Sequence, residues 1–216
     1  GLDRRGPQRQ QVEWLLAHAP VGARWCLVHA THMVDRETHA LAATGAVAGL
    51  APTTEADLGD GTFPGVAYSG SGGRWGVGSD SNAIVDPFAE LRQLEYSQRI
   101  FWRRRNLMHD GDDATIGTAM WLAACRGGAQ ACGRRTGAIE AGAGADLVVL
   151  DGEDPALAGH AGDAVLAAAI FGPCRRPVRH TMLAGRWVVR DGRHRDEDAV
   201  LGGFRRAIAR IANGAK

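Results

Sequence analysis

Apolar residues in the first 132 positions alternate between two patterns. Three short runs, at 25–30, 46–50 and 75–78, are mostly apolar and are bounded by Gly, Pro or polar residues, as in strands buried in a parallel sheet. Around these runs, apolar positions return every three or four residues, which predicts helices. The expected helices cover 8–19, 36–44 with Asp35 as cap, 87 to the arginines at 103–105, and 115–132. This alternation predicts an α/β fold in which βα units surround a parallel sheet.

The helix after the third strand has a clear start, because Asp86 is a cap residue and Pro87 favours the first helical position. Its inward side chains should be Phe88, Leu91, Leu94 and Phe101. Residues 53–73, by contrast, are rich in Gly, Thr, Asp and Ser. We expect them to form a long irregular loop, which in a compact domain is usually functional or mobile.

After residue 133 the pattern changes to short β-like runs separated by turn residues. The expected strands are 146–151, 165–171, 178–183 and 186–190. Ala184 and Gly185 join the last two strands, which predicts a hairpin. Residues 196–212 are amphipathic and predict a closing helix. We therefore divide the chain into an α/β part at 1–132 and a smaller, mostly β part at 133–216.

Charge and composition narrow the class of protein. Of 216 residues, 25 are Lys or Arg and 24 are Asp or Glu, a balance that does not favour nucleic acid or an anionic membrane as partner. No apolar stretch reaches the roughly 18 residues of a membrane span, and the first residues lack the apolar core of a signal peptide. We expect a cytoplasmic protein whose partner is a small molecule.

The four cysteines do not form a Cys-x-x-Cys pair. Their positions are Cys26, Cys125, Cys132 and Cys174. A zinc knuckle or a disulfide framework is therefore not expected. We expect four buried thiols in a reducing compartment.

Titratable residues follow each of the three strands expected in the first part. The first strand leads into His29 and His32, the second into Glu55 and the third into Asp80. In parallel α/β sheets, functional groups gather at the carboxyl ends of strands. Imidazole and carboxylate groups ligate metals and move protons near neutral pH, which favours a hydrolytic site, although either residue type is also common in purely structural roles. The Gly-x-Ser-x-Gly elbow of serine hydrolases and the phosphate-binding glycine motifs are absent.

The chain resembles the metal-dependent amidohydrolase superfamily. Four motifs occur in the order found there, at 25–32, 49–61, 76–81 and 136–151. The His-Ala-Thr-His run at 29–32 and the Pro-Thr-Thr-Glu-Ala-Asp-Leu-Gly-Asp-Gly run at 52–61 are similar, more narrowly, to the formimidoylglutamate deiminases of histidine degradation. Related purine deaminases tend to carry Asn in place of Glu55.

The resemblance implies a fold and a reaction. Residues 1–132 would supply strands six to eight of a (β/α)₈ barrel, and residues 133–216 a small β-sandwich-type domain. The implied reaction is hydrolysis of the C=N bond of N-formimidoyl-L-glutamate to N-formyl-L-glutamate and ammonia. A bound Zn²⁺ ion would lower the pKa of the attacking water toward ~7.

The resemblance also assigns roles to individual residues. Asp80 would ligate the zinc ion and take the proton of the attacking water, and His29 would hydrogen-bond that water. Ser81, Asn82 and Glu55 would contribute to substrate binding. Asn82 stands where many relatives have His, which leaves the substrate less closely defined.

Most of the family's metal ligands find no match in this chain. The His-x-His pair of the first barrel strand, the His of the fifth and the acid/base Glu after it would precede residue 1. A barrel takes about 250 residues and a catalytic zinc about three protein ligands. We therefore expect the carboxyl-terminal half of a deiminase that is a homodimer when complete. Alone, the chain should be inactive, metal-free and prone to aggregation through an open sheet edge.

Two alternatives remain open from the sequence. The same fold could act on an aminopurine or another cyclic amidine, in which case the preceding residues would form an aromatic pocket for a base. The chain could also be a non-catalytic interaction module that retains the fold without the chemistry.

Overall fold

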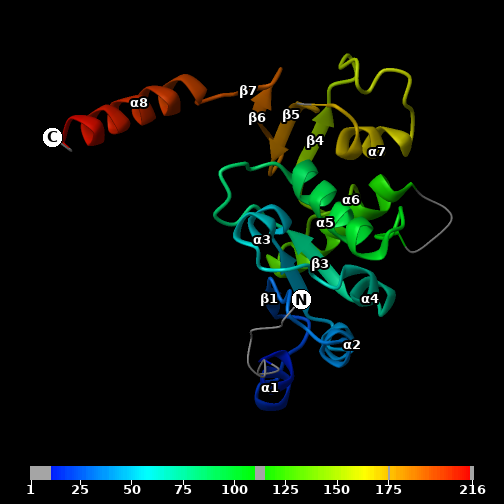
Figure 1. Cartoon of the computed structure of the whole chain (residues 1–216). Helices are drawn as coiled ribbons and strands as arrows, with labels where there is room; N and C mark the ends of the chain where they lie inside the picture. Colours follow the sequence, from blue (N-terminus) through cyan, green and yellow to red (C-terminus); the bar gives the residue numbers. More distant parts are fainter. Residues whose placement is uncertain (1–10, 110–114, 175, 215–216) are drawn as a thin grey trace.

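A computed structural model describes residues 11–109, 115–174 and 176–214 (Figure 1). The first part is built on a three-stranded parallel sheet in the order β1-β2-β3. Its strands are β1 (Cys26–Val28), β2 (Val47–Leu50) and β3 (Arg74–Val77). The three apolar runs therefore form strands as predicted, and the parallel pairing of the sheet is confirmed.

Helices alternate with these strands. They are α1 (Gln11–His18), α2 (Asp35–Ala43), α5 (Pro87–Trp102) and α6 (Ile116–Ala131). Helix α2 begins at Asp35 itself. Val34, the residue before the helix, donates a hydrogen bond from its N–H to the Glu37 side chain. The core joins side chains of the sheet and the helices, including Leu41, Leu50, Trp75, Leu91 and Met120.

Phe101 does not face inward, so that prediction is wrong. Its side chain is 68% exposed, and its neighbours Ile100 and Trp102 are exposed as well, whereas Phe88 and Leu94 are buried as predicted. The three residues that end α5 are thus all exposed, so helical spacing alone does not show that a side chain is buried.

The irregular loop expected at 53–73 is also wrong, because the structure has two short helices there. They are α3 (Pro52–Leu58) and α4 (Gly65–Gly70). Pro52 fits the first turn of α3, and Gly59, with φ of 73°, ends it. The glycines of this segment therefore lie mainly at helix ends. Tyr68 of α4 is fully buried, and its hydroxyl donates a hydrogen bond to Ala46 O. Burial also raises the pKa of Tyr68 to about 12.

The second part contains one antiparallel sheet in the order β4-β5-β6-β7. Its strands are β4 (Leu147–Leu150), β5 (Val178–Leu183), β6 (Arg186–Arg190) and β7 (Arg193–His194). The predicted hairpin between β5 and β6 is confirmed, and Ala184 and Gly185 both have positive φ, as a type I′ turn requires.

Residues 165–171 form a helix, α7 (Ala164–Phe171), where a strand was predicted. Short apolar runs fit either structure, and alanine, the strongest helix former, dominates this one. Helix α7 also packs closely on α6, where a Cβ on Gly117 would lie 2.4 Å from Ala167 N.

The expected closing helix, α8 (Glu197–Gly214), forms but buries none of its residues. Figure 1 shows it extending away from the rest of the chain. Within the described residues, no helix combines the length and the apolar character needed to cross a bilayer.

The cysteines differ from the expectation in their burial. All four are free, as predicted, but Cys26 and Cys132 are exposed, and Cys125 and Cys174 are only partly buried. Cys26 is on an edge strand, and Cys132 follows the last residue of α6, so neither position is enclosed.

The cap of α5 gives a first test of the structure. Asp86 accepts a hydrogen bond from Phe88 N–H at 2.9 Å, which satisfies a donor at the helix start. We expect Asp86→Ala to lower the free energy of unfolding by about 1 kcal/mol, measured by urea denaturation. Asp163 precedes α7 in the same way but makes no cap hydrogen bond with its side chain, so Asp163→Ala is the matched control. Equal losses in the two variants would contradict the assigned cap.

Candidate active site

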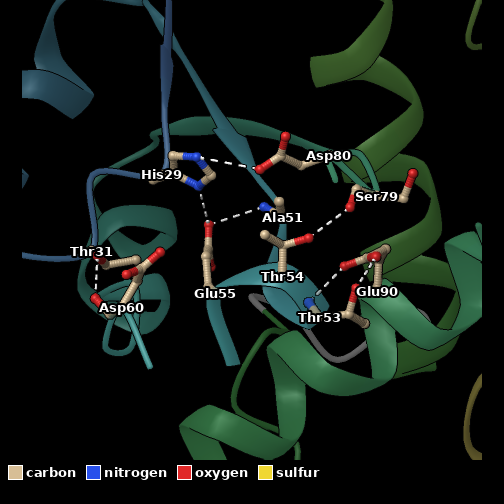
Figure 2. Close-up of polar contacts among 10 residues, drawn as sticks. All are labelled: His29, Thr31, Ala51, Thr53, Thr54, Glu55, Asp60, Ser79, Asp80 and Glu90. Atoms are coloured by element: carbon tan, nitrogen blue, oxygen red, sulfur yellow. Dashed lines mark hydrogen bonds and ion pairs between the residues drawn. The ribbon is translucent and has the colours of Figure 1, made fainter. Parts of the chain in front are cut away.

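His29 and Asp80 lie side by side at the carboxyl-terminal rim of the parallel sheet (Figure 2). His29 directly follows β1, and Asp80 follows β3 after two residues. Although β2 separates these strands, the turns after them bring His29 Nε2 to 3.7 Å from Asp80 Oδ2. Their side chains are 37% and 45% exposed, so a small molecule can reach both. The structure thus brings together the two residues predicted to be catalytic, and their chemical roles stay a prediction.

Both residues adopt a backbone conformation that is rare outside glycine. The φ angle is 66° at His29, 51° at Ala30 and 50° at Asp80, all in the left-handed region. Such a conformation costs about 1–3 kcal/mol and persists only where its surroundings hold it. The His29 N–H donates to Gly49 O at 2.8 Å, which ties this residue to β2. Strain of this kind clusters at active sites, so it supports a functional interpretation of this rim.

The Glu55 side chain lies beneath His29 and contacts two nitrogen atoms. It is 5% exposed, and its Oε1 accepts a hydrogen bond from Ala51 N–H at 3.0 Å and lies 3.2 Å from His29 Nδ1. Burial raises the pKa of Glu55, whereas these two contacts act in the opposite direction. The carboxylate thus faces His29. The role in substrate binding that was predicted for Glu55 stays a prediction.

Ser81 and Asn82 continue the loop that carries Asp80. Asn82 N–H donates to Ser79 O at 3.0 Å, and the Asn82 side-chain oxygen accepts from Ile84 N–H at 2.9 Å. These contacts stabilise the turn itself. Ser81 is exposed directly after Asp80, and the substrate-binding role of Ser81 and Asn82 stays a prediction.

Sequence reasoning missed the polar side chains that hold α3 under this site. Thr54 Oγ1 donates to Ser79 O at 2.8 Å, and Thr53 N–H donates to Glu90 Oε2 at 2.9 Å. Glu90 is only 1% exposed. Glu90 lies four residues before the inward-facing Leu94, and therefore on the same face of α5. An ionisable side chain on a buried helix face needs a partner, so this position was the signal in the sequence.

A cleft of about 470 Å³ opens beside His29. Its lining includes His29, Thr31, His32, Met33 and Asp60. Thr31 Oγ1 donates to Asp60 O at 2.7 Å, which fastens the turn after β1 (Figure 2). A volume of this size is enough for a small-molecule ligand.

The metal ligands available here are fewer than a catalytic site needs. Among the described residues, no three His, Cys, Asp or Glu side chains form a group that could hold a metal ion. Asp80 and His29 are close enough to share one, but Glu55 is directed at Ala51 and His29. Because a catalytic zinc takes about three protein ligands, the described part of the chain holds an incomplete set.

Comparisons with known proteins agree with the sequence motifs. Residues 3–188 match the model of the amidohydrolase family. The formimidoylglutamate deiminase of Pseudomonas aeruginosa is 47% identical over 203 residues, which cover 94% of this chain but 45% of the relative. The chain therefore spans less than half of the length of that relative.

Solved structures lead to the same family. An amidohydrolase from Brucella melitensis is 44% identical, with a TM-score of 0.86 over 93% of this chain and 44% of its own. An adenosine deaminase from Xanthomonas campestris with bound zinc shares the fold at 24% identity, with a TM-score of 0.75 over 94% of this chain and 49% of its own. The family match covers most of this chain, and the chain therefore belongs to the amidohydrolase family.

Proposed function

We propose that the chain is the carboxyl-terminal part of a formimidoylglutamate deiminase and supplies His29 and Asp80 to its active site. The 3.7 Å approach of His29 Nε2 to Asp80 Oδ2 carries this proposal, and the identity to the Pseudomonas aeruginosa enzyme supports the substrate. In this proposal residues 1–132 supply strands six to eight of a (β/α)₈ barrel, and residues 133–216 belong to a small β-sandwich-type domain.

The two side chains divide the chemistry of C=N hydrolysis between them. Water adds through its oxygen to the amidine carbon of N-formimidoyl-L-glutamate. The bond from this carbon to the terminal nitrogen then breaks, so ammonia leaves and a formyl group remains. The Asp80 carboxylate accepts one proton of the attacking water and passes it to the terminal nitrogen, and it then transfers the remaining hydroxyl proton to the same nitrogen as the C=O bond forms, so that ammonia leaves. His29 presents Nε2 to the same water as a hydrogen-bond acceptor and so orients the attacking oxygen toward the amidine carbon.

In this proposal Asp80 also ligates the metal ion. A Zn²⁺ ion held there would supply a water of lowered pKa, toward ~7. The Asp80 side chain is accessible at the rim, so its carboxylate can provide one ligand. In this proposal the other ligands come from residues outside this chain, as the incomplete set described above requires.

A chimera tests the proposed function. In it, this chain replaces the 203 matching residues of the Pseudomonas aeruginosa deiminase, which supplies the remaining part of the protein. We expect the chimera to release ammonia from N-formimidoyl-L-glutamate with kcat/KM within about 10–100-fold of the parent enzyme, because the rim residues are retained. Coupled measurement of ammonia and zinc content provides the readout.

The chain alone is the control for this experiment. With one metal-ligating carboxylate it should neither retain stoichiometric zinc nor release ammonia. A folded, zinc-loaded chimera without turnover would contradict the proposal. Turnover of adenosine in place of N-formimidoyl-L-glutamate would instead favour a purine deaminase.

A further inference from the structure

The contacts around Glu55 determine which atoms can carry a proton. A backbone N–H can only donate, so the Ala51 N–H at 3.0 Å makes Glu55 Oε1 an acceptor. His29 Nδ1 meets the same oxygen at 3.2 Å. The carboxylate oxygen that faces Nε2, Asp80 Oδ2, is 3.7 Å away and beyond hydrogen-bond distance. In a neutral imidazole the proton is therefore favoured on Nδ1, the nitrogen with an acceptor within reach, which leaves Nε2 with its lone pair.

The segment that carries Glu55 is anchored on both sides. Thr53 donates to Glu90 of α5 through its N–H and its hydroxyl, and Thr54 donates to Ser79 of the loop after β3 (Figure 2). These contacts link α3 to α5 and to the loop that carries Asp80. Because Glu55 is buried and its helix is fixed in this way, its carboxylate offers His29 a rigid acceptor.

We propose that Glu55 is the positioning residue of His29. Its carboxylate accepts the Nδ1 proton and so directs the unprotonated Nε2 toward Asp80, 3.7 Å away. The consequence for catalysis rests on the proposed function, in which Nε2 meets the attacking water. The tautomer itself is a property of this chain and does not depend on the reaction.

Nitrogen NMR of the chain alone tests the tautomer. With ¹⁵N-labelled histidine at a pH where the ring is neutral, the His29 signals are identified by their loss in His29→Gln. We expect the Nδ1–H form in the parent chain and in Glu55→Gln, because the amide oxygen still accepts. In Glu55→Ala we expect a shift toward the Nε2–H form, whereas Glu140→Ala, at an exposed position, should change nothing.

A second variant protects this test against misfolding. Glu55→Leu keeps the buried volume without an acceptor and gives the same readout if the alanine variant does not fold. A His29 tautomer that is identical in the parent and in a folded variant without an acceptor would overturn the proposal.

Kinetics of the chimera separate positioning from substrate binding. A positioning role predicts that Glu55→Ala lowers kcat by about 10–100-fold with little change in KM, and that Glu55→Gln restores most of the loss. A raised KM with unchanged kcat would instead make Glu55 a substrate-binding residue and contradict the positioning role. If the parent chimera has no activity, the proposed function fails, whereas the NMR measurement still decides the role of Glu55.

Discussion

In the chimera, Asp80→Asn is expected to lower kcat by about a thousandfold, because proton transfer by a positioned side chain contributes roughly 10²–10⁴-fold. The amide keeps the size of the side chain and one oxygen, but it cannot accept the proton of the attacking water. It is also a weaker metal ligand than a carboxylate, so zinc content should fall together with turnover. Steady-state ammonia release and metal analysis of the same preparation measure both effects.

The fold of this variant should remain intact. Asparagine tolerates the left-handed conformation that Asp80 adopts, so the urea midpoint should be equal to or higher than that of the parent. Asp57, exposed on α3, provides the matched control, and Asp57→Asn should leave kcat within about twofold. A kcat for Asp80→Asn within tenfold of the parent would mean that another group carries the proton.

Gly127→Ala is expected to cost about 3 kcal/mol of stability in the chain alone, because α6 and β3 touch through their backbones at this point. A Cβ on Gly127 would lie 1.8 Å from Trp75 O and 3.1 Å from Gly76 N. Backbone atoms in a buried strand cannot move aside as the end of a flexible side chain can, so the helix must shift away from the sheet. Urea denaturation followed by circular dichroism measures the loss.

The next residue should show the opposite effect. A Cβ on Gly128 would meet nothing within 4 Å, and alanine is the better helix former by about 1 kcal/mol. Gly128→Ala should therefore raise the free energy of unfolding. Equal losses of stability in the two variants would contradict the close contact assigned to Gly127 and Trp75.

The parallel strands could be predicted because their apolar runs are too short for helices and are closed by turn residues. The common rim of His29 and Asp80 followed from this, since parallel strands end at the same edge of a sheet. Helix α7 was missed because four alanines in a short apolar run fit either structure, and the close contact of Gly117 with α7 is invisible in the sequence. The prediction for Phe101 was wrong because the spacing of apolar residues along α5 does not show where the elements that pack against this helix end.

The site itself could be predicted only in part. Residue type and position in the chain identified His29, Asp80 and Glu55 as candidates. The contact of Glu55 with His29 and the bond from Thr53 to Glu90 join segments far apart in the sequence, so only the fold brings them together. Positive φ at non-glycine residues likewise depends on surrounding hydrogen bonds and leaves no mark in composition.

The left-handed backbone at Asp80 has a consequence for protein engineering. In a library of all amino acids at this position, the clones that express best should carry Gly or Asn, because these residues accept the conformation with the least strain. The clones that turn over substrate should carry Asp. A selection for solubility and a selection for turnover would therefore enrich different sequences at the same codon.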